Sequence, residues 1–149
     1  MSTGKFDVIA ITDHILMKRD PTNPNWRKGV STCFLIQSQL ALKAGSKAQA
    51  LNLAQHSVAA ARTVHTSDAV DDGFVNARAY LALGDAERAL GNSAAARTAW
   101  NQALAAIPTD VTERSDETAV RATVLERLGR GNEAAPLRSR LKQVGYEED

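Results

Sequence analysis

The most constraining part of the sequence is residues 79–108, AYLALGDAERALGNSAAARTAWNQALAAIP. Apolar residues recur here at helical spacing on both sides of Gly91 and Asn92, a pair that favours a tight turn. Pro108 closes the stretch, because proline cannot continue a helix. We therefore expect a hairpin of two amphipathic helices, the first over about 74–90 and the second over about 93–107.

The same residues resemble the tetratricopeptide repeat (TPR), whose pattern is W-x₂-L-G-x₂-Y, then A-x₃-F, then P. This chain has Tyr80-x₂-Leu83-Gly84, then Ala96-x₃-Trp100, then Pro108. The resemblance implies that Gly84 and Ala96 lie where the two helices cross closely, with Trp100 in the core beside them. Glu87 departs from the pattern, which has an aromatic residue there, and we expect it to mark a wetter, more open interface.

Weaker copies of this unit flank the central one. Gly45, Gly91 and Gly129 each follow an apolar helical stretch, and an alanine comes five residues after each glycine. The glycines are spaced more widely than the 34 residues of an ideal repeat. Stacked hairpins bury an apolar face that one pair alone leaves uncovered. We therefore expect an all-α, right-handed α-solenoid of about three TPR-like hairpins plus a leading N-terminal helix, with about seven helices in all.

The length fits one domain spanning residues 1–149. Its expected parts are a disordered start at 1–5, a leading helix at 6–19, hairpins at 24–65, 74–108 and 115–144, and a solvated tail at 145–149, with a polar loop at 66–73.

Several helix ends are predicted from capping residues. Asn23 and Pro24 are typical of a helix start, and Gly45 is typical of a left-handed helix end. Ser46 and Gln49 have the spacing of a capping box. Asn132 is expected to cap the last helix.

Composition excludes several classes of protein. The net charge is +1 with acids and bases interspersed, whereas nucleic-acid and membrane-surface proteins carry a basic patch. No apolar run reaches the roughly 18 residues of a membrane span, and the N-terminus lacks a signal-peptide pattern. We expect a cytoplasmic protein. Cys33 is the only cysteine, so an intramolecular disulfide is excluded, and it is expected to be a buried apolar residue.

The TPR resemblance implies a binding surface, because in that family the first helix of each pair lines a concave face along which partner peptides lie. By position, the inner residues are expected to be Gln39, Lys43, Arg78, Leu81, Asp85, Arg88, Glu126 and Arg127, together with Thr32, Leu35 and Thr123. This face mixes both charges and lacks the Lys/Asn set with which chaperone-binding TPR domains clamp a peptide carboxylate. The implied function is a non-catalytic scaffold or adaptor that needs no cofactor and binds a peptide or a partner domain.

Two features near the N-terminus suggest further partners. The segment DPTNPNWRKGVS resembles the connector between TPR-like units in long bacterial arrays of regulatory proteins. The leading helix would leave a face with Ile9, Ile15 and Leu16 partly uncovered. We expect that face to form a homodimer or to contact an upstream domain.

An alternative function centres on Asp13, His14 and Cys33, as a small all-α metal-binding protein or enzyme. The segment FDVIAITDH is similar to a metal-binding segment of PHP-type phosphoesterases, but the upstream His-x-His of that family is absent. His56 and His65 are the other histidines, and a metal site needs several more ligands than an Asp-His pair. The alternative predicts a bound metal ion that depends on His14.

Overall fold

The computed structural model describes residues 18, 20, 22–109 and 111–148. Over these ranges it contains six α-helices and no strand, which confirms the all-α prediction. The helices are α2 (Pro24–Lys43), α3 (Lys47–Ala61), α4 (Ala69–Ala89), α5 (Ser93–Ala106), α6 (Ser115–Arg127) and α7 (Gly131–Gln143). The predicted leading helix at 6–19, the disordered start and the proposed self-association face lie outside the described residues.

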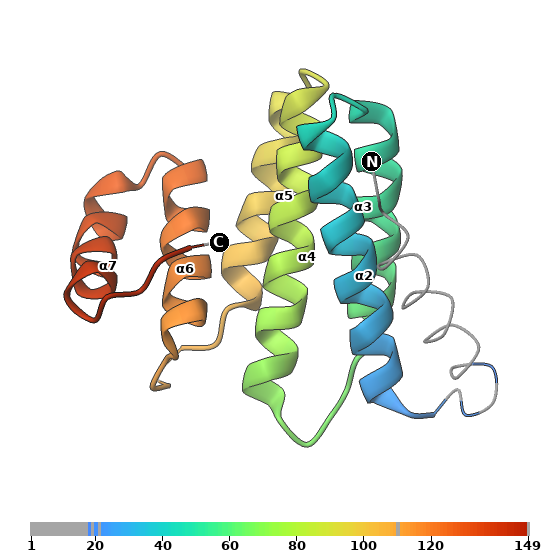
Figure 1. The fold of residues 1–149 in the computed structure, drawn as a ribbon, viewed down its shortest axis with the longest axis horizontal. Helices are drawn as coiled ribbons and strands as arrows, with labels where there is room; N and C mark the ends of the chain where they lie inside the picture. Colours follow the sequence, from blue (N-terminus) through green and yellow to red (C-terminus); the bar gives the residue numbers. More distant parts are fainter. Residues whose placement is uncertain (1–17, 19, 21, 110, 149) are drawn as a thin grey trace.

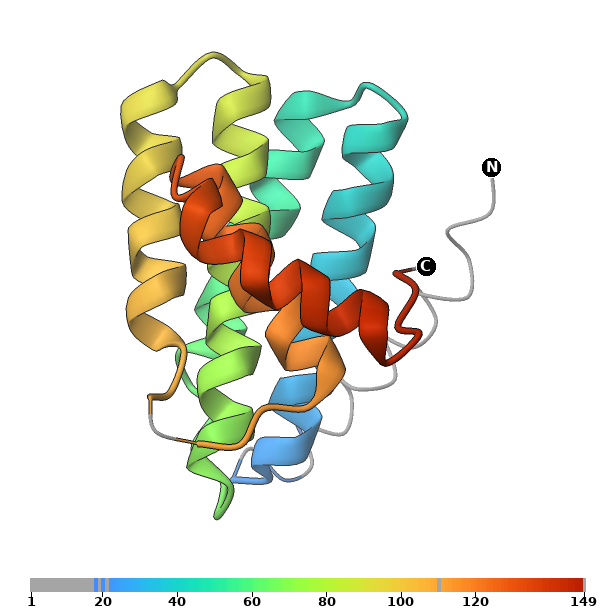
Figure 2. The same ribbon diagram turned by 90° about the vertical axis from the view of Figure 1, so that its left-hand side faces the viewer.

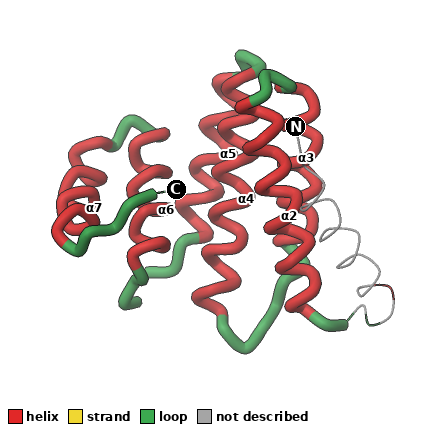
Figure 3. Tube along the Cα trace, viewed as in Figure 1, coloured by secondary structure: helices red, strands yellow, loops and turns green. Residues whose placement is uncertain are grey.

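The helices pack as consecutive pairs. α2 packs against α3, α4 against α5, and α6 against α7. Contacts of α3 and α2 with α4, and of α5 and α4 with α6, join the pairs in chain order across the molecule (Figure 1). The last helix, α7, crosses the others obliquely at one end (Figure 2). Short loops make the described connections (Figure 3).

The turns within the pairs share one backbone geometry. Gly45, Gly91 and Gly129 have φ of 80°, 83° and 76°, the left-handed region that glycine adopts without a steric penalty. In each turn the next residue closes the helix end: for example, the Asn92 N–H donates to the Glu87 carbonyl at 2.9 Å. The left-handed end predicted at Gly45 is therefore confirmed.

Two predicted boundaries are wrong. α4 begins at Ala69 inside the predicted loop, because the Asp68 side chain caps it by accepting from the Asp71 N–H at 2.9 Å. The acidic residues that suggested a loop suit a helix N-terminus instead. α3 ends at Ala61 rather than near 65, and Val64 beyond it is buried in the turn.

Of the three predicted N-terminal helix caps, one forms and two do not. The Asn23 side chain accepts from the Asn25 N–H at 3.1 Å ahead of Pro24, as expected. Ser46 makes no side-chain capping bond, so the predicted capping box does not form. Asn132 lies inside α7, which follows the Gly129 turn directly because the Arg130 N–H already bonds to the Leu125 carbonyl.

The core is built mainly from alanine, which allows close helix approach. Trp100 is only 6% exposed, and its indole lies directly against Gly84, leaving no space for a Cβ there. Ala96 is fully buried on the same helix as Trp100. These positions agree with the core roles predicted for the three residues.

The first pair has a different core, in which buried hydroxyl groups join the helices. Ser31 and Ser57 each donate to the other's backbone carbonyl, at 2.9 and 2.8 Å. Ser38 donates to the Ala50 carbonyl at 2.8 Å. Cys33, at 4% exposure, is buried as predicted. The buried serine side chains therefore all have hydrogen-bond partners within the otherwise apolar interface between α2 and α3.

Candidate functional site

The first helices of the three pairs, α2, α4 and α6, together line one groove of about 670 Å³. Its lining residues are Ser31, Thr32, Leu35 and Gln39 from α2, Val75, Arg78, Leu81, Ala82 and Asp85 from α4, Asp116, Ala119, Val120, Thr123 and Arg127 from α6, and Tyr146, Glu147 and Glu148 from the C-terminal tail.

Helical periodicity explains which side chains of α2 and α4 line the groove. On α2, Thr32, Leu35 and Gln39 follow the spacing i, i+3, i+7, which places them on one helix face. On α4, Arg78, Leu81 and Asp85 repeat that spacing. Each helix thus presents a leucine between two polar residues, and the groove offers apolar contacts flanked by hydrogen-bonding groups.

Most of the residues predicted for the inner face line this groove. From the predicted binding set these are Gln39, Arg78, Leu81, Asp85 and Arg127, joined by Thr32, Leu35 and Thr123. Exposed Lys43 does not line the groove and lies in the last turn of α2. Arg88 and Glu126 also lie off it: the Arg88 guanidinium stacks 5.3 Å from the Trp100 ring centroid, and Glu126 pairs with Arg138.

The charged residues of the groove pair across α4 and α6. Arg78 Nη2 lies 3.0 Å from Asp116 Oδ2, and Arg127 Nε lies 2.8 Å from Asp85 Oδ1. The same Asp85 oxygen accepts from Trp100 Nε1 at 3.2 Å. Asp85 also lies near Arg88 of the same helix, at the longer distance of 4.0 Å. Arg78, Asp85 and Arg127 therefore hold helices together as well as line the groove.

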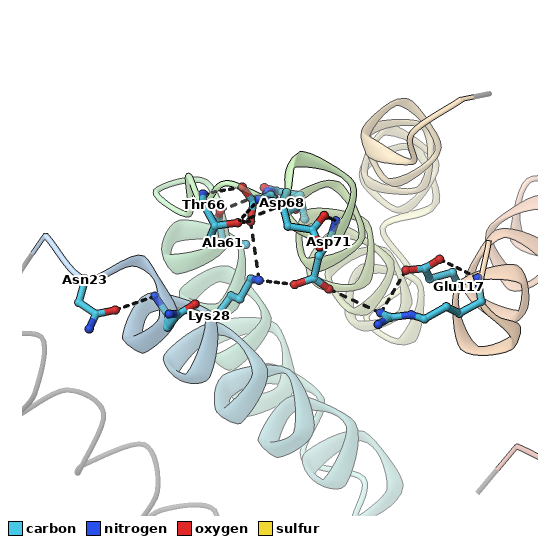
Figure 4. Close-up of polar contacts among 11 residues, drawn as sticks. Asn23, Lys28, Ala61, Thr66, Asp68, Asp71 and Glu117 are labelled. Atoms are coloured by element: carbon cyan, nitrogen blue, oxygen red, sulfur yellow. Dashed lines mark hydrogen bonds and ion pairs between the residues drawn. The ribbon is translucent and has the colours of Figure 1, made fainter. Parts of the chain in front are cut away.

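A second ion-pair network crosses the first helices near their N-terminal ends (Figure 4). Lys28 of α2 pairs with Asp71 of α4, and Arg114, the residue before α6, lies 3.7 Å from the same aspartate. Arg114 also lies 3.1 Å from the buried carboxylate of Glu117. Sequence reasoning missed this network, because its partners are far apart in the chain and no local spacing identifies them.

Glu87 has a local role that the sequence did not indicate. Its carboxylate accepts from the Asn92 side-chain amide at 2.7 Å, and its carbonyl accepts from the Asn92 backbone. The departure from the aromatic pattern thus supports the turn at the tip of the α4–α5 pair.

The C-terminal tail turns back toward the groove. Gly145 has φ of 69°, and the Tyr146 N–H donates to the Leu141 carbonyl at 3.0 Å. Glu148 accepts a hydrogen bond from Arg138 Nη1, while Glu147 is exposed. The tail was predicted only as a solvated segment; the side chains of Glu147 and Glu148 are indeed exposed, and the described part of the tail also forms one end of the groove.

Arg138 connects the tail to the last pair of helices. It donates to both Glu126 carboxylate oxygens, at 2.9 and 3.0 Å, and to Thr123 Oγ1 at 2.9 Å. The hydrogen bond from Arg138 holds the pKa of the Glu126 carboxyl below its ordinary value. Hydrogen bonds to Glu126 and Glu148 raise the pKa of Arg138, so this guanidinium stays charged.

Of the three residues at the centre of the metal hypothesis, the structure describes Cys33 alone. Asp13 and His14 lie outside the described residues, and Cys33 is buried on α2. His56 stacks on Phe34 with ring centroids 5.2 Å apart, and His65 is exposed beyond α3. Among the residues that the structure describes, no group of three or more His, Cys, Asp or Glu side chains is arranged to hold a metal ion.

Comparison with protein-family models, with curated proteins and with solved structures finds no match for this chain. No described helix combines the length and the apolar character needed to cross a membrane.

Proposed function

We propose that this chain is a TPR-like, non-catalytic interaction module that binds an extended peptide segment of a partner protein in the groove of α2, α4 and α6. In this proposal the described helices form the hairpins of a right-handed solenoid, and the leading helix precedes them. The proposed location is the cytoplasm, and the proposed relatives are the helical arrays of bacterial regulatory proteins. The observation that carries it is that the first helix of every described pair contributes side chains to one groove.

The chemistry of the groove suits a peptide better than a small metabolite. Leu35 and Leu81 offer apolar contacts, and the exposed Thr32 and Gln39 supply a hydroxyl and an amide group that can bond to a peptide backbone. The lining arginines are already paired with aspartates, so the groove has no unpaired cation among them for a strongly charged ligand. Its volume lies within the roughly 300–1,000 Å³ typical of ligand clefts, enough for a few residues.

The test is selection of peptides on the immobilised full chain from a random displayed library, followed by affinity measurements with purified binders. Gln39→Trp places a bulky ring on the groove wall, and Gln55→Trp makes the same change at an exposed position on α3 outside the groove. We expect Gln39→Trp to weaken binding at least about tenfold, a loss of about 1.4 kcal/mol, and Gln55→Trp to leave binding unchanged.

Both variants should first show the same thermal melt as the unaltered chain, because each changes an exposed glutamine. A library that returns no binder, or binders equally tight on both tryptophan variants, would overturn the proposed function.

A further inference from the structure

The C-terminal tail lies at the groove that we propose for a partner. On the basis of that proposed function, we infer that residues Tyr146–Glu148 are an intramolecular occupant of the groove, and that the partner is an acidic peptide segment that displaces them and takes the place of Glu148 at Arg138.

The direction of the tail is set by its backbone. Gly145 adopts the same left-handed turn as Gly45, Gly91 and Gly129, each of which reverses the chain after a helix. The Tyr146 N–H bonds to the Leu141 carbonyl, which fixes this reversal at the end of α7. The tail is thereby returned toward α6 and contributes three consecutive residues to the groove.

The tail is held lightly. Tyr146 is half-buried, and the same three residues also line a second hollow of about 350 Å³ on the α7 side, beside Arg138, Leu141 and Lys142. With open space on both faces, the tail has far less apolar contact than a packed core segment. Such a segment can leave the groove at small cost in free energy.

One ion pair distinguishes the two glutamates of the tail. Glu148 accepts from Arg138 Nη1, whereas Glu147 has no hydrogen bond or ion pair to another residue in the described part of the chain. The other nitrogens of Arg138 are committed to Glu126 and Thr123, which belong to α6. The Glu148 position is therefore the exchangeable one, and the carboxylate of a partner can replace it without disturbing α6 and α7.

The charge to which the tail is bound, next to the groove, favours the same partner chemistry. Arg78 and Arg127 are neutralised within the helices by Asp116 and Asp85. Arg138 lines the second hollow rather than the groove itself, and it takes one of its two carboxylate partners from the tail. A segment that carries a glutamate or aspartate restores that pair when the tail leaves, while a basic segment would leave Arg138 with Glu126 as its one carboxylate partner.

The experiment uses a fluorescein-labelled peptide with the sequence of residues 142–149, KQVGYEED, as the probe, and measures its anisotropy with the full chain. In the unaltered chain the attached tail competes at a millimolar effective concentration. Glu148→Lys breaks the pair with Arg138 and should release the tail. Glu133→Lys makes the same charge change and also breaks a glutamate–arginine pair, but at an exposed site on α7 that lines neither hollow, and it serves as the matched control.

We expect Glu148→Lys to bind the probe about tenfold more tightly than the unaltered chain, and Glu133→Lys to stay within about twofold of it. Adding Gln39→Trp to Glu148→Lys should abolish the gain. Equal binding by the two lysine variants, absence of probe binding to all of them, or a gain that survives Gln39→Trp would each overturn the inference.

Failure of this inference is distinguishable from failure of the proposed function. Peptides selected from the random library test the groove without reference to the tail. If they bind in a Gln39-dependent manner while the probe does not, only the tail inference fails. If the library yields no binder but the probe shows the expected gain, the tail occupies the groove and the proposed external partner fails.

Discussion

The central pair α4–α5 and the last pair α6–α7 have the same kind of glycine turn but are stabilised by different interactions. In the central pair, Trp100 lies against Gly84, and Phe74 and Ala103 are fully buried. In the last pair the buried apolar contact is smaller, built around Leu125 and alanines, and a guanidinium bridges the two helices. One backbone unit can therefore be held by tight packing in one place and by charged hydrogen bonds in another.

The attachment of the last pair to the rest of the molecule extends this contrast. Val124 is its fully buried contact with the central core, and ion pairs surround that contact. Arg127 reaches Asp85, and Arg121 donates to the Pro108 carbonyl at 2.8 Å. Salt screens exposed ion pairs but hardly affects packing, so the two pairs of helices should respond differently to the same changes in solution.

The largest expected effect is at Trp100. Trp100→Ala should lower the free energy of unfolding by about 3–5 kcal/mol, because it leaves a cavity between α4 and α5. Urea unfolding followed by circular dichroism measures the change, with Asn101→Ala at the exposed neighbouring position as the control. A thermal melt unchanged by Trp100→Ala would remove this residue from the core.

Gly84→Ala tests the same contact from the opposite helix. The added methyl group would overlap the Trp100 indole, and overpacking of this kind costs about 1–3 kcal/mol. Gly131→Ala is the matched control, because a Cβ there meets open space and alanine favours the helix. The penalty at Gly84 should shrink in a Trp100→Leu background; an equal penalty in both backgrounds would show that the indole is not its cause.

Arg127→Gln probes the charged attachment of the last pair. It should cost about 1–2 kcal/mol, because Asp85 loses a partly buried charged partner. Raising the ionic strength to about 1 M should shrink this cost, whereas the cost of Trp100→Ala should stay constant. The exposed Arg97 on α5 supplies the control Arg97→Gln. An Arg127→Gln penalty independent of salt would argue for a packing role instead.

The smallest expected effect is the pH response of Glu126. Arg138 depresses the pKa of this carboxyl in the folded chain, so the unfolded state binds the proton first as pH falls. The contribution of the ionised Glu126 carboxylate to stability is complete above the unfolded-state pKa of about 4.3. It is lost as the pH falls through the lower pKa of the folded state.

Glu126→Gln should therefore cost about 0.5 kcal/mol at pH 7, and this cost should disappear at low pH. Urea midpoints at the two pH values measure it, with Glu147→Gln as the control. A cost that persists below the folded pKa would show that the ionised carboxylate is not the cause.

The parts that could be predicted from the sequence are those governed by local spacing. The helical periodicity, the glycine turns and the close contact of Gly84 with Trp100 follow from residues near one another in the chain. The positions that the TPR resemblance implies for the inner face also include eight of the 17 residues that line the groove. The start of α4 was missed, because Asp68 caps a helix with the same acidic residues that suggested a loop.

The parts that could not be predicted depend on contacts between distant residues. Arg127 is 42 residues from Asp85, and Lys28 is 43 residues from Asp71, so nothing local pairs them. The internal partners of the residues predicted for the inner face, those of Asp85 above all, were likewise not foreseen. The position of the tail follows from the Gly145 turn, which was not recognised as a fourth copy of the turns at Gly45, Gly91 and Gly129.

The hydrogen bond between Trp100 and Asp85 makes the indole an optical reporter. Its Nε1–H faces the carboxylate that also holds Arg127, and the Arg88 guanidinium lies over the ring. Separation of α6 from α4 would remove one positive charge beside the chromophore and admit water to it. The emission wavelength of Trp100, recorded with Trp26 replaced by phenylalanine, would then follow that separation without an added label, even while the central pair stays folded.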